Sequence, residues 1–395
     1  MKIVHISLNC PYNDGWGYQE NILTKVQSRL GHLVTLIVGC FAFSEDASGS
    51  VKIVNESRYT NADGVDVIRL KTERFFRNSC VEKIARRLGF TYHKIENILE
   101  ELSPDVIFLH GLNHNITNKQ IIDYVKKHRS ECKLFGDTHI FSQNDPYVSV
   151  PQKMLFHLLF LPRIKRNYKY YSRFFYVTPE GRDYATKKYK IKKSNMAFLP
   201  LGYDPLLCDW ERREDIRYSV REKHGIPSDA VLLVHGGKIT SIRKTPEVIK
   251  AFSKLENKNL RLVIFGGIAD EMLSEVNELL ADNPSIIYLG KLSQKEYYDL
   301  YLASDIGVFP GGQSVLWQEA IGCGLPLIVK KAPGLEYLDV GGNVLYIDDD
   351  SVDSIYGGIY QTLEDGAFRR MSEVASSEGR KVFSYERIAT ISCGL

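Results

Sequence analysis

The segment DIGVFPGGQSVLWQEAIGCGLPLIV, residues 305–329, decides the fold predicted for this chain. Asp305–Phe309 is apolar and rich in β-forming residues, which predicts a buried strand. Pro310–Gln313 is a glycine loop, Ser314–Gly322 has helical character, and Leu327–Lys330 is again typical of a strand. The order strand, glycine loop, helix, strand predicts one unit of a parallel sheet.

The same alternation continues in both directions and forms two sets, which a turn-rich segment at Pro200–Pro205 separates. An acidic, polar stretch follows that segment up to about Asp229. Strands alternating with helices predict an α/β protein with two Rossmann-like, doubly wound domains that face a central cleft. The expected strands are Lys2–Leu8, His32–Val38, Val65–Leu70, Asp105–His110, Cys132–Gly136, Phe174–Val177, Met196–Leu199, Ala230–His235, Leu260–Phe265, Ile286–Leu289, Asp305–Phe309 and Leu327–Lys330.

The glycine loop and the helix after it have the chemistry of an anion site. Glycines ahead of a helix N-terminus let backbone N–H groups approach an anion, and the helix dipole favours the negative charge. Glu319 lies about one and a half turns into this helix, where its carboxylate can accept two hydroxyls, such as those of a ribose. The alternative is a loop that only turns the chain, with Glu319 on a solvated face.

Glu319 is followed by Ala320, Gly324 and Pro326. This pattern resembles the signature of the retaining GT-B glycosyltransferases of family 4, which is Glu-x7-Glu followed by Ala and Gly-x-Pro. The resemblance implies that Glu319 binds the nucleotide ribose. It also implies a last helix, within residues 381–395, that returns to the first domain.

The first Glu of that signature falls on Gly311, so this chain departs from the pattern. Gln313 is the nearest polar residue and is expected to substitute in part. Since the missing Glu holds donor-sugar hydroxyls in the family, the resemblance does not carry over the identity of the sugar. Within the same loop it implies donor contacts from Gly311, Gly312, Gln313 and the backbone amides of Ser314 and Val315.

Residues 235–252 resemble the Gly-Arg…Lys-Gly segment of the same family. Lys238 takes the Arg position and Lys244 the Lys position, and Arg243 is an alternative to Lys244. Two fixed cations suit a diphosphate leaving group, whose charge grows in the transition state; solvated residues in a turn are the alternative. Further donor contacts are expected from Gly266, Leu289 and Gly290, which otherwise only turn the chain at strand ends.

In the first half, Gly15 and Gly17 lie between a strand and a helix and resemble the family's glycine loop. Their neighbours Asp14, Trp16 and Tyr18 are either acceptor contacts or surface turn residues.

Two strand-end histidines complete the expected site. His139 resembles the strand-end histidine that contacts the donor sugar, with a structural role as the alternative. His110 is expected to line the cleft on the acceptor side. His110 and His114 also have the spacing of metal ligands, but no third ligand suggests itself, and no metal is expected.

The charge of the chain is unevenly placed. Its 395 residues have a net charge of only +3, yet residues 151–193 hold 12 basic and 2 acidic residues. Within them, residues 151–176 combine basic, apolar and aromatic side chains, which suits an anionic membrane surface. The alternative is a core helix with a solvated far face; the catalytic resemblance argues against nucleic acid. Seven widely spaced cysteines without a C-x-x-C motif predict reduced thiols in a cytoplasmic protein, with no signal peptide.

The resemblance implies a retaining glycosyltransferase that moves a sugar from a nucleotide-sugar to a glycan or a lipid-linked glycan, in bacterial polysaccharide biosynthesis. Residues 1–205 form the acceptor-side domain and residues 206–380 the nucleotide-sugar-binding domain. UDP is favoured over GDP, with no further cofactor, and the enzyme works in the cytoplasm, with the inner face of the plasma membrane as a site of peripheral binding. The alternatives are a GT-B nucleotide-sugar 2-epimerase and a non-catalytic carbohydrate-binding relative. A Rossmann oxidoreductase is weaker, because the loop lacks the third glycine and the acidic residue of that fingerprint.

Overall fold

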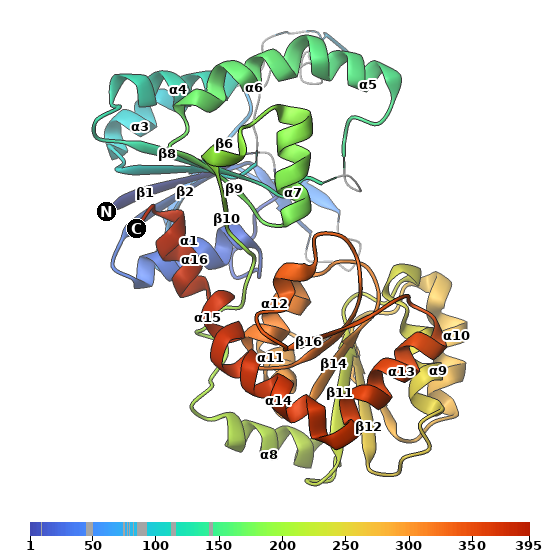
Figure 1. Ribbon diagram of the computed structural model, residues 1–395. Helices are drawn as coiled ribbons and strands as arrows, with labels where there is room; N and C mark the ends of the chain where they lie inside the picture. The colour runs from blue at the N-terminus through green and yellow to red at the C-terminus, as the bar shows by residue number, and fades with distance from the viewer. Residues whose placement is uncertain are drawn as a thin grey trace. The chain divides into compact units, whose positions relative to one another are not determined.

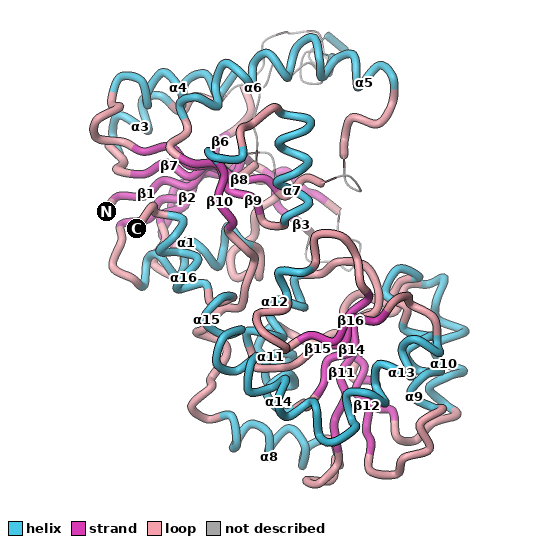
Figure 2. Tube along the Cα trace, in the orientation of Figure 1, coloured by secondary structure: helices cyan, strands magenta, loops and turns pink. Residues whose placement is uncertain are grey.

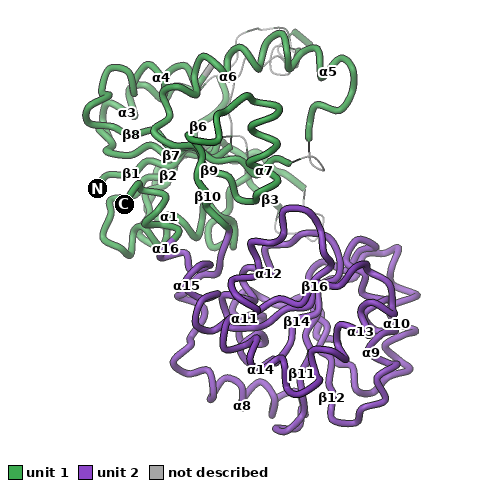
Figure 3. The backbone as a smooth tube through the Cα atoms, viewed as in Figure 1, with its two compact units in different colours: residues 1–200, 388–395 green, residues 201–387 purple. Residues whose placement is uncertain are grey.

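The computed structural model describes residues 1–8, 10–44, 50–73, 76, 78, 80–81, 83–84, 93–111, 116–141 and 145–395. The chain divides into two compact units (Figure 3). The N-terminal unit holds residues 1–200 and 388–395, and the C-terminal unit holds residues 201–387. In each unit the strands form a central sheet with helices on both faces (Figure 2), which confirms the predicted pair of Rossmann-like folds.

The N-terminal unit is built on a sheet of order β10-β9-β8-β7-β1-β2-β6-β5 (Figure 1). Every pairing is parallel except that of β5 with β6. Its strands are β1 (Lys2–Ser7), β2 (Leu33–Gly39), β5 (Ser57–Thr60), β6 (Asp66–Leu70), β7 (Val106–Leu109), β8 (Lys133–Thr138), β9 (Arg173–Tyr176) and β10 (Met196–Phe198), and a separate hairpin pairs β3 (Phe41–Phe43) with β4 (Val51–Ile53). The helices are α1 (Gln19–Arg29), α3 (Glu96–Leu102), α4 (Ile116–Lys127), α5 (Val150–Leu155), α6 (Leu161–Asn167) and α7 (Pro179–Tyr184).

The C-terminal unit has a fully parallel sheet of order β13-β12-β11-β14-β15-β16. Successive residues of its central strand face opposite ways: Leu232 and Val234 pack into one apolar cluster and Leu233 into the other. The strands are β11 (Val231–Gly236), β12 (Leu260–Phe265), β13 (Ile286–Tyr288), β14 (Ile306–Phe309), β15 (Leu327–Lys330) and β16 (Val344–Ile347). The helices are α8 (Arg213–Lys223), α9 (Thr245–Ser253), α10 (Leu273–Ala281), α11 (Gln294–Ala303), α12 (Val315–Gly322), α13 (Val352–Leu363), α14 (Ala367–Val374), α15 (Arg380–Val382) and α16 (Tyr385–Ser392), whose end belongs to the other unit.

All expected strands are present, to within two residues at each end. Among the described elements, these were not predicted: β3 and β4 of the hairpin, β5, α7, α8 and β16. Helix α8 occupies the stretch that was expected to be only polar and acidic.

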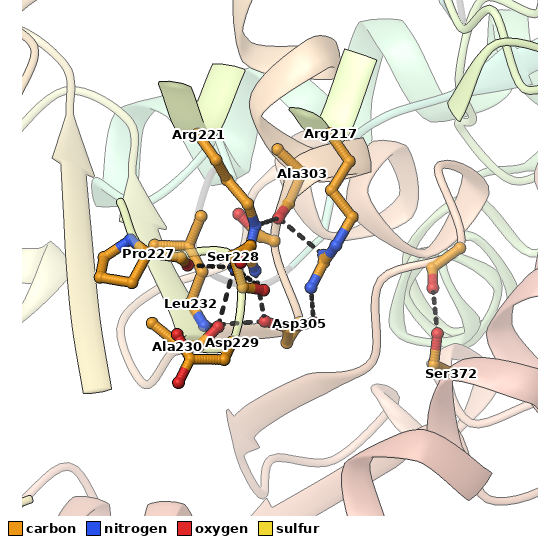
Figure 4. Close-up of polar contacts among 12 residues, drawn as sticks. Arg217, Arg221, Pro227, Ser228, Asp229, Ala230, Leu232, Ala303, Asp305 and Ser372 are labelled. Atoms are coloured by element: carbon orange, nitrogen blue, oxygen red, sulfur yellow. Dashed lines mark hydrogen bonds and ion pairs between the residues drawn. The ribbon is translucent and has the colours of Figure 1, made fainter. Parts of the chain in front are cut away.

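An arginine cluster holds α8 in place (Figure 4), and Ile216 and Val220 of the same helix pack against the apolar core of the unit. Arg221 is 3% exposed and pairs with Asp305 Oδ2 at 2.8 Å, while Arg217 pairs with Asp305 Oδ1 at the same distance. The guanidinium of Arg221 also donates to the carbonyls of Pro227, Ser228, Ala230 and Ala303. Ile216 and Val220 alone give a weak hydrophobic pattern, which is why the sequence analysis missed this helix.

The last helix returns to the N-terminal unit, as the family resemblance implied. Residues 388–395 belong to that unit, where Gln27 Nε2 donates to Ser392 Oγ at 2.9 Å. A Cβ placed on Gly394 would lie 2.8 Å from the Phe135 ring, so the chain end packs closely on β8. Over the described part of the chain, no helix has both the length and the apolar character that a membrane crossing requires.

Candidate functional site

The strand order of the C-terminal unit reverses between β11 and β14, which are neighbours in the sheet. Ligands of open α/β sheets bind beside the carboxyl ends of the strands at such a point. The loop after β11 (residues 237–244) and the loop after β14 (residues 310–314) leave the sheet here. They lead into the N-termini of α9 and α12.

These two loops hold each other through the backbone. Gly312 N–H donates to the Ile242 carbonyl at 3.1 Å. The Arg243 guanidinium donates to the carbonyls of Gly312 at 2.6 Å and Gln313 at 3.3 Å. Arg243 is therefore a clamp between the loops in this structure.

Gly311 has no room for a side chain. A Cβ at this position would lie 2.4 Å from the Ile242 carbonyl oxygen and 2.7 Å from the Arg243 Cα. The loop after β11 thus takes up the space that the first glutamate of the family signature would need.

The two lysines that were expected to face a diphosphate differ in their surroundings. Lys238 is exposed and forms no ion pair within the described residues. Lys244 lies directly before α9, and its Nζ is 3.3 Å from Glu247 Oε1 and 4.0 Å from Asp350 Oδ2. An anion that binds Lys244 has to compete with these two carboxylates.

Ser314 is the N-cap of α12, and its hydroxyl accepts from the Leu316 N–H at 3.3 Å. Val315 is the first residue of the helix. Both lie where the positive end of the helix dipole favours an anion, as expected for a diphosphate contact.

Of the two glycines at the neighbouring strand ends, Gly266 has a packing reason to be glycine, whereas Gly290 has open space at its Cβ and a φ of +67°. Gly266 has a φ of +125°, and a Cβ there would lie 1.9 Å from the Gly237 carbonyl oxygen. Its N–H donates to the Gly290 carbonyl at 2.6 Å, and the Leu289 N–H donates to Ile264 at 2.9 Å. This packing joins the ends of β11, β12 and β13; ligand contacts from these residues stay a prediction.

Glu319 is 1% exposed, so the alternative of a solvated face is wrong. Its carboxylate accepts hydrogen bonds from the Tyr297 hydroxyl at 3.1 Å, the Tyr298 hydroxyl at 3.2 Å and Gln294 Nε2 at 3.0 Å. Burial raises the pKa of Glu319 to about 7, although these hydrogen bonds act in the opposite direction. A ribose that binds Glu319 would have to share the carboxylate with, or displace, these donors.

The three partners of Glu319 were missed by the sequence analysis. They lie on one helix, α11, in the run QKEYYDLY (residues 294–301). The Tyr297 ring stacks on Phe265 at the end of β12, with ring centroids 5.6 Å apart. Adjacent tyrosines close to a predicted nucleotide site were a usable signal, since a buried carboxylate needs hydroxyl or amide donors.

In the N-terminal unit, the loop after β1 carries one engaged carboxylate and two open aromatic rings. Asp14 accepts from the hydroxyls of Tyr12 at 2.9 Å and Tyr59 at 2.8 Å, which ties it to the loop. Trp16 and Tyr18 are 37% and 45% exposed. Trp16 stacks on Phe43 in the unpredicted hairpin, at 5.0 Å. Gly15 lies between Asp14 and Trp16, and Gly17 lies shortly before α1.

His110 and His139 follow the ends of β7 and β8 and meet at one carboxylate, Asp137. His139 Nε2 lies 3.2 Å and His110 Nδ1 3.7 Å from Asp137 Oδ2. The His139 side chain is 42% exposed, whereas Asp137 is fully buried. Asp137 was not predicted, although a strand places residues two apart on one face. His114 lies outside the described residues, and no cluster of metal ligands occurs among those described.

The basic segment forms α5, a π-helical turn (Phe156–Phe160), α6 and the start of β9. Its apolar residues divide: Phe156, Phe160 and Ile164 are buried in the core of the unit. Met154 and Leu158 are 58% and 69% exposed. Only part of the expected apolar surface is therefore available to a partner.

Comparisons with known proteins agree with this architecture. Residues 217–382 match the family model described as Glycosyl transferases group 1. A segment of 129 residues is 29% identical to the O-antigen chain mannosyltransferase B of Escherichia coli, and it covers 32% of this chain and 34% of that relative. The chain thus matches about a third of the length of its curated relative.

Several solved structures share the fold. A glycosyltransferase from Rickettsia africae has a TM-score of 0.66 at 15% identity, over 98% of this chain and 96% of that one. Anabaena HepE, solved with UDP and glucose, has a TM-score of 0.63 at 15% identity over 99% and 98%. WaaG, a glycosyltransferase involved in lipopolysaccharide biosynthesis, has a TM-score of 0.59 at 15% identity over 99% and 100%.

The fold is therefore that of the two-domain GT-B glycosyltransferases. Within it, residues 217–382, most of the C-terminal unit, match the family model of the glycosyl transferases group 1. The narrower likeness to family 4 stays a prediction.

Proposed function

We propose that this protein is a retaining glycosyltransferase that moves a sugar from a nucleotide-sugar to a glycan or lipid-linked glycan in polysaccharide biosynthesis. The observation that carries the proposal is the pair of hydrogen-bonded loops at the point where the strand order reverses in the C-terminal unit. They offer two helix N-termini and the cations Lys238 and Lys244 to one diphosphate. The group 1 domain match covers the same residues.

In this proposal the protein supplies position and charge. The backbone amides at Ser314 and Val315 and the lysines stabilise the leaving diphosphate as its charge grows. Glu319 orients the nucleoside through the ribose. The leaving phosphate itself takes the proton of the acceptor hydroxyl on the same face of the sugar, so no separate base is required. We expect catalysis without a bound metal.

The named relatives support the class of substrates. One acts in O-antigen synthesis by its name, one in lipopolysaccharide synthesis by its title, and HepE was solved with UDP and glucose. We therefore favour UDP over GDP as the nucleotide and a bacterial surface glycan or its lipid-linked precursor as the acceptor. The fold alone does not choose the sugar.

A panel of nucleotide-sugars tests the reaction, with nucleotide release measured with and without glycan acceptors. Acceptor-dependent release that falls strongly in Lys244→Ala, and less in Lys238→Ala, supports the proposal. Conversion of the donor to its 2-epimer without an acceptor would instead identify an epimerase. Binding without turnover would identify a carbohydrate-binding relative, and the anomeric configuration of the product decides between retention and inversion.

We further propose that the N-terminal unit binds an anionic membrane surface, where a lipid-linked acceptor would lie. Val150, Met154 and Leu158 are spaced four residues apart and are 58–70% exposed, which gives one apolar stripe. Lys165 and Arg166 are exposed and form no ion pair with the described carboxylates. Each basic residue near such a surface contributes about 1 kcal/mol.

Co-sedimentation with vesicles tests this surface. We expect binding to rise with the fraction of anionic lipid and to fall with added salt. Met154→Ser with Leu158→Ser, and Lys165→Glu with Arg166→Glu, should each weaken it. Tyr218→Ser, at a residue that is 67% exposed in the other unit, is the matched control. Wild-type protein that stays in the supernatant at low salt would refute the membrane proposal and favour a soluble acceptor.

A further inference from the structure

A chain of buried polar side chains runs beneath the strand ends of the N-terminal unit. It starts at His5 on β1, continues to His110 after β7, and reaches Asp137 on β8; these three strands are neighbours in the sheet. His5 Nδ1 and His110 Nε2 are 3.0 Å apart. His5 and Asp137 are fully buried, so each polar atom needs a partner within the protein.

The carboxylate of Asp137 is held by the backbone on one side. Its Oδ1 accepts the Gly111 N–H at 2.8 Å. Its Oδ2 faces His139 Nε2 at 3.2 Å and His110 Nδ1 at 3.7 Å. The fixed oxygen leaves the other one within hydrogen-bond distance of His139, whereas His110 at 3.7 Å is beyond that distance.

The contacts assign the hydrogen on His139. Its Nε2 faces two acceptors, Asp137 Oδ2 at 3.2 Å and Gln19 Oε1 at 2.7 Å. A bare nitrogen lone pair would repel both oxygens, so Nε2 carries the hydrogen. The tautomer with hydrogen on Nδ1 alone does not fit this geometry.

The other end of the chain is assigned in the same way. His5 Nε2 lies 2.6 Å from Gln27 Oε1, and the Gln27 amide donates to Ser392 Oγ at 2.9 Å. His5 therefore donates from Nε2 and accepts at Nδ1 from His110. Burial and the neighbouring His110 lower the pKa of His5 to about 3, so His5 is neutral. The chain thus ends in the returning C-terminal helix.

The charged groups of this series of side chains are Asp137 and its neighbour His139. Burial opposes ionisation of Asp137, but His139 and His110 more than offset it, and its pKa lies far below the ordinary range. Burial also opposes protonation of His139; Asp137 reverses this and raises the pKa of His139 above 6.5. The titratable groups that act on His139 or interact with its carboxylate partner are Asp137 on β8, His110 after β7, Glu20 on α1, Cys10 after β1, His5 on β1 and Tyr171 before β9.

We propose that Asp137 is a positioning residue: its buried carboxylate accepts the Nε2–H of His139, orients that ring and stabilises its protonated form, so that the end of β8 presents a charged hydrogen-bond donor. The inference deepens the proposed function and rests on it for the role of His139. Gln19 is uncharged, so it can orient the ring but cannot stabilise its charge, and Asp137 is the carboxylate in direct contact with the ring.

NMR titration of the histidine rings tests the proposal without any assay of activity. In wild-type protein the His139 ring should show hydrogen on Nε2 and should titrate above an unstructured histidine. Asp137→Asn keeps the size and removes the charge, so the midpoint of His139 should fall by about one pH unit or more. Asp137→Glu should restore part of the shift. Asp123→Asn, which removes an exposed carboxylate that pairs with Lys119 and Lys126, is the control.

An unchanged His139 midpoint in folded Asp137→Asn would overturn the proposal. If that variant does not fold, the wild-type spectrum still decides, because a ring protonated only on Nδ1 contradicts it. The pH profile of kcat/KM separates two statements: that Asp137 sets the state of the His139 ring, and that His139 takes part in the reaction. A profile that shifts with the His139 midpoint supports both; a shifted midpoint with an unshifted profile leaves Asp137 as the positioning residue and removes His139 from the reaction.

Discussion

Replacing Glu319 with Gln should stabilise the protein above neutral pH while it weakens nucleotide binding. The carboxylate is 1% exposed, and burial raises its pKa from 4.5 to about 7. Tyr297, Tyr298 and Gln294 donate to it, but they do not replace the solvation that it loses. The native protein therefore holds a carboxyl group that ionises more readily once the chain unfolds.

The sign and size follow from linkage. Below pH 4.5 both the folded and the unfolded carboxyl are protonated, and the stabilisation is fully present. This stabilisation is lost as the pH rises from 4.5 to about 7, because the unfolded carboxyl group releases its proton in this range while the folded one keeps it. A difference between 4.5 and about 7 corresponds to about 3 kcal/mol at 1.36 kcal/mol per unit. Gln does not titrate, so the variant lacks this loss.

Urea unfolding of both proteins at pH 5 and pH 8 measures the effect. The stability of Glu319→Gln relative to wild type should be about 2–3 kcal/mol more favourable at pH 8 than at pH 5. Glu373→Gln, at an exposed carboxylate of the same unit, should show no such change.

Calorimetry with UDP should show weaker binding in Glu319→Gln and a larger loss of affinity in Glu319→Ala. A stability difference that is the same at both pH values would refute the pKa argument; unchanged UDP affinity in Glu319→Ala would remove Glu319 from the nucleotide site.

Three further changes have outcomes that follow from the contacts. Lys244→Ala should lower kcat/KM about 100-fold or more with little loss of thermal stability, because its partners are only surface carboxylates; near-normal turnover would remove it from the site. Asp305→Asn should lower the free energy of unfolding, measured by urea titration, by about 3–5 kcal/mol, since Arg221 stays buried without its charge partner. Gly311→Ala should cost about 1–3 kcal/mol, whereas Gly357→Ala, which has open space at its Cβ, should not destabilise.

Most strands of the C-terminal sheet followed from the sequence because they depend on local pattern, whereas their order in the sheet did not. β12 and β15 were predicted to the residue, since a strand that is buried on both faces is a continuous apolar run. Helix α8 was missed because its hydrophobic pattern is weak and the salt bridge that holds it joins Arg221 and Asp305, which are far apart in the sequence. The β3–β4 hairpin was missed because β4 is exposed along its length and carries no core pattern.

The sequence predicted the motifs of the candidate site, but it did not predict which side chains contact the residues of those motifs. Spacing placed Glu319 in the helix after the glycine loop, but it could not show that tyrosines from α11 cover the carboxylate. His139 was identified directly after a strand, while Asp137, two residues before it on β8, was not identified, although the two side chains are in contact. Electrostatic partners depend on which strands become neighbours, and that order is a property of the tertiary fold.

The departure at Gly311 is more than a lost side chain. Its Cα rests on the backbone of Ile242 and Arg243, and Arg243 in turn holds the carbonyls of Gly312 and Gln313. A glutamate at this position would displace the loop that carries the proposed phosphate cations. The two loops therefore form one packed unit. Under the proposed function, a change in the contacts of one loop to the donor sugar would also change the contacts of the other loop to the phosphates. A carboxylate could stand at position 311 only together with a changed path of residues 240–244, so the glycine at this position goes with the close packing of the two loops.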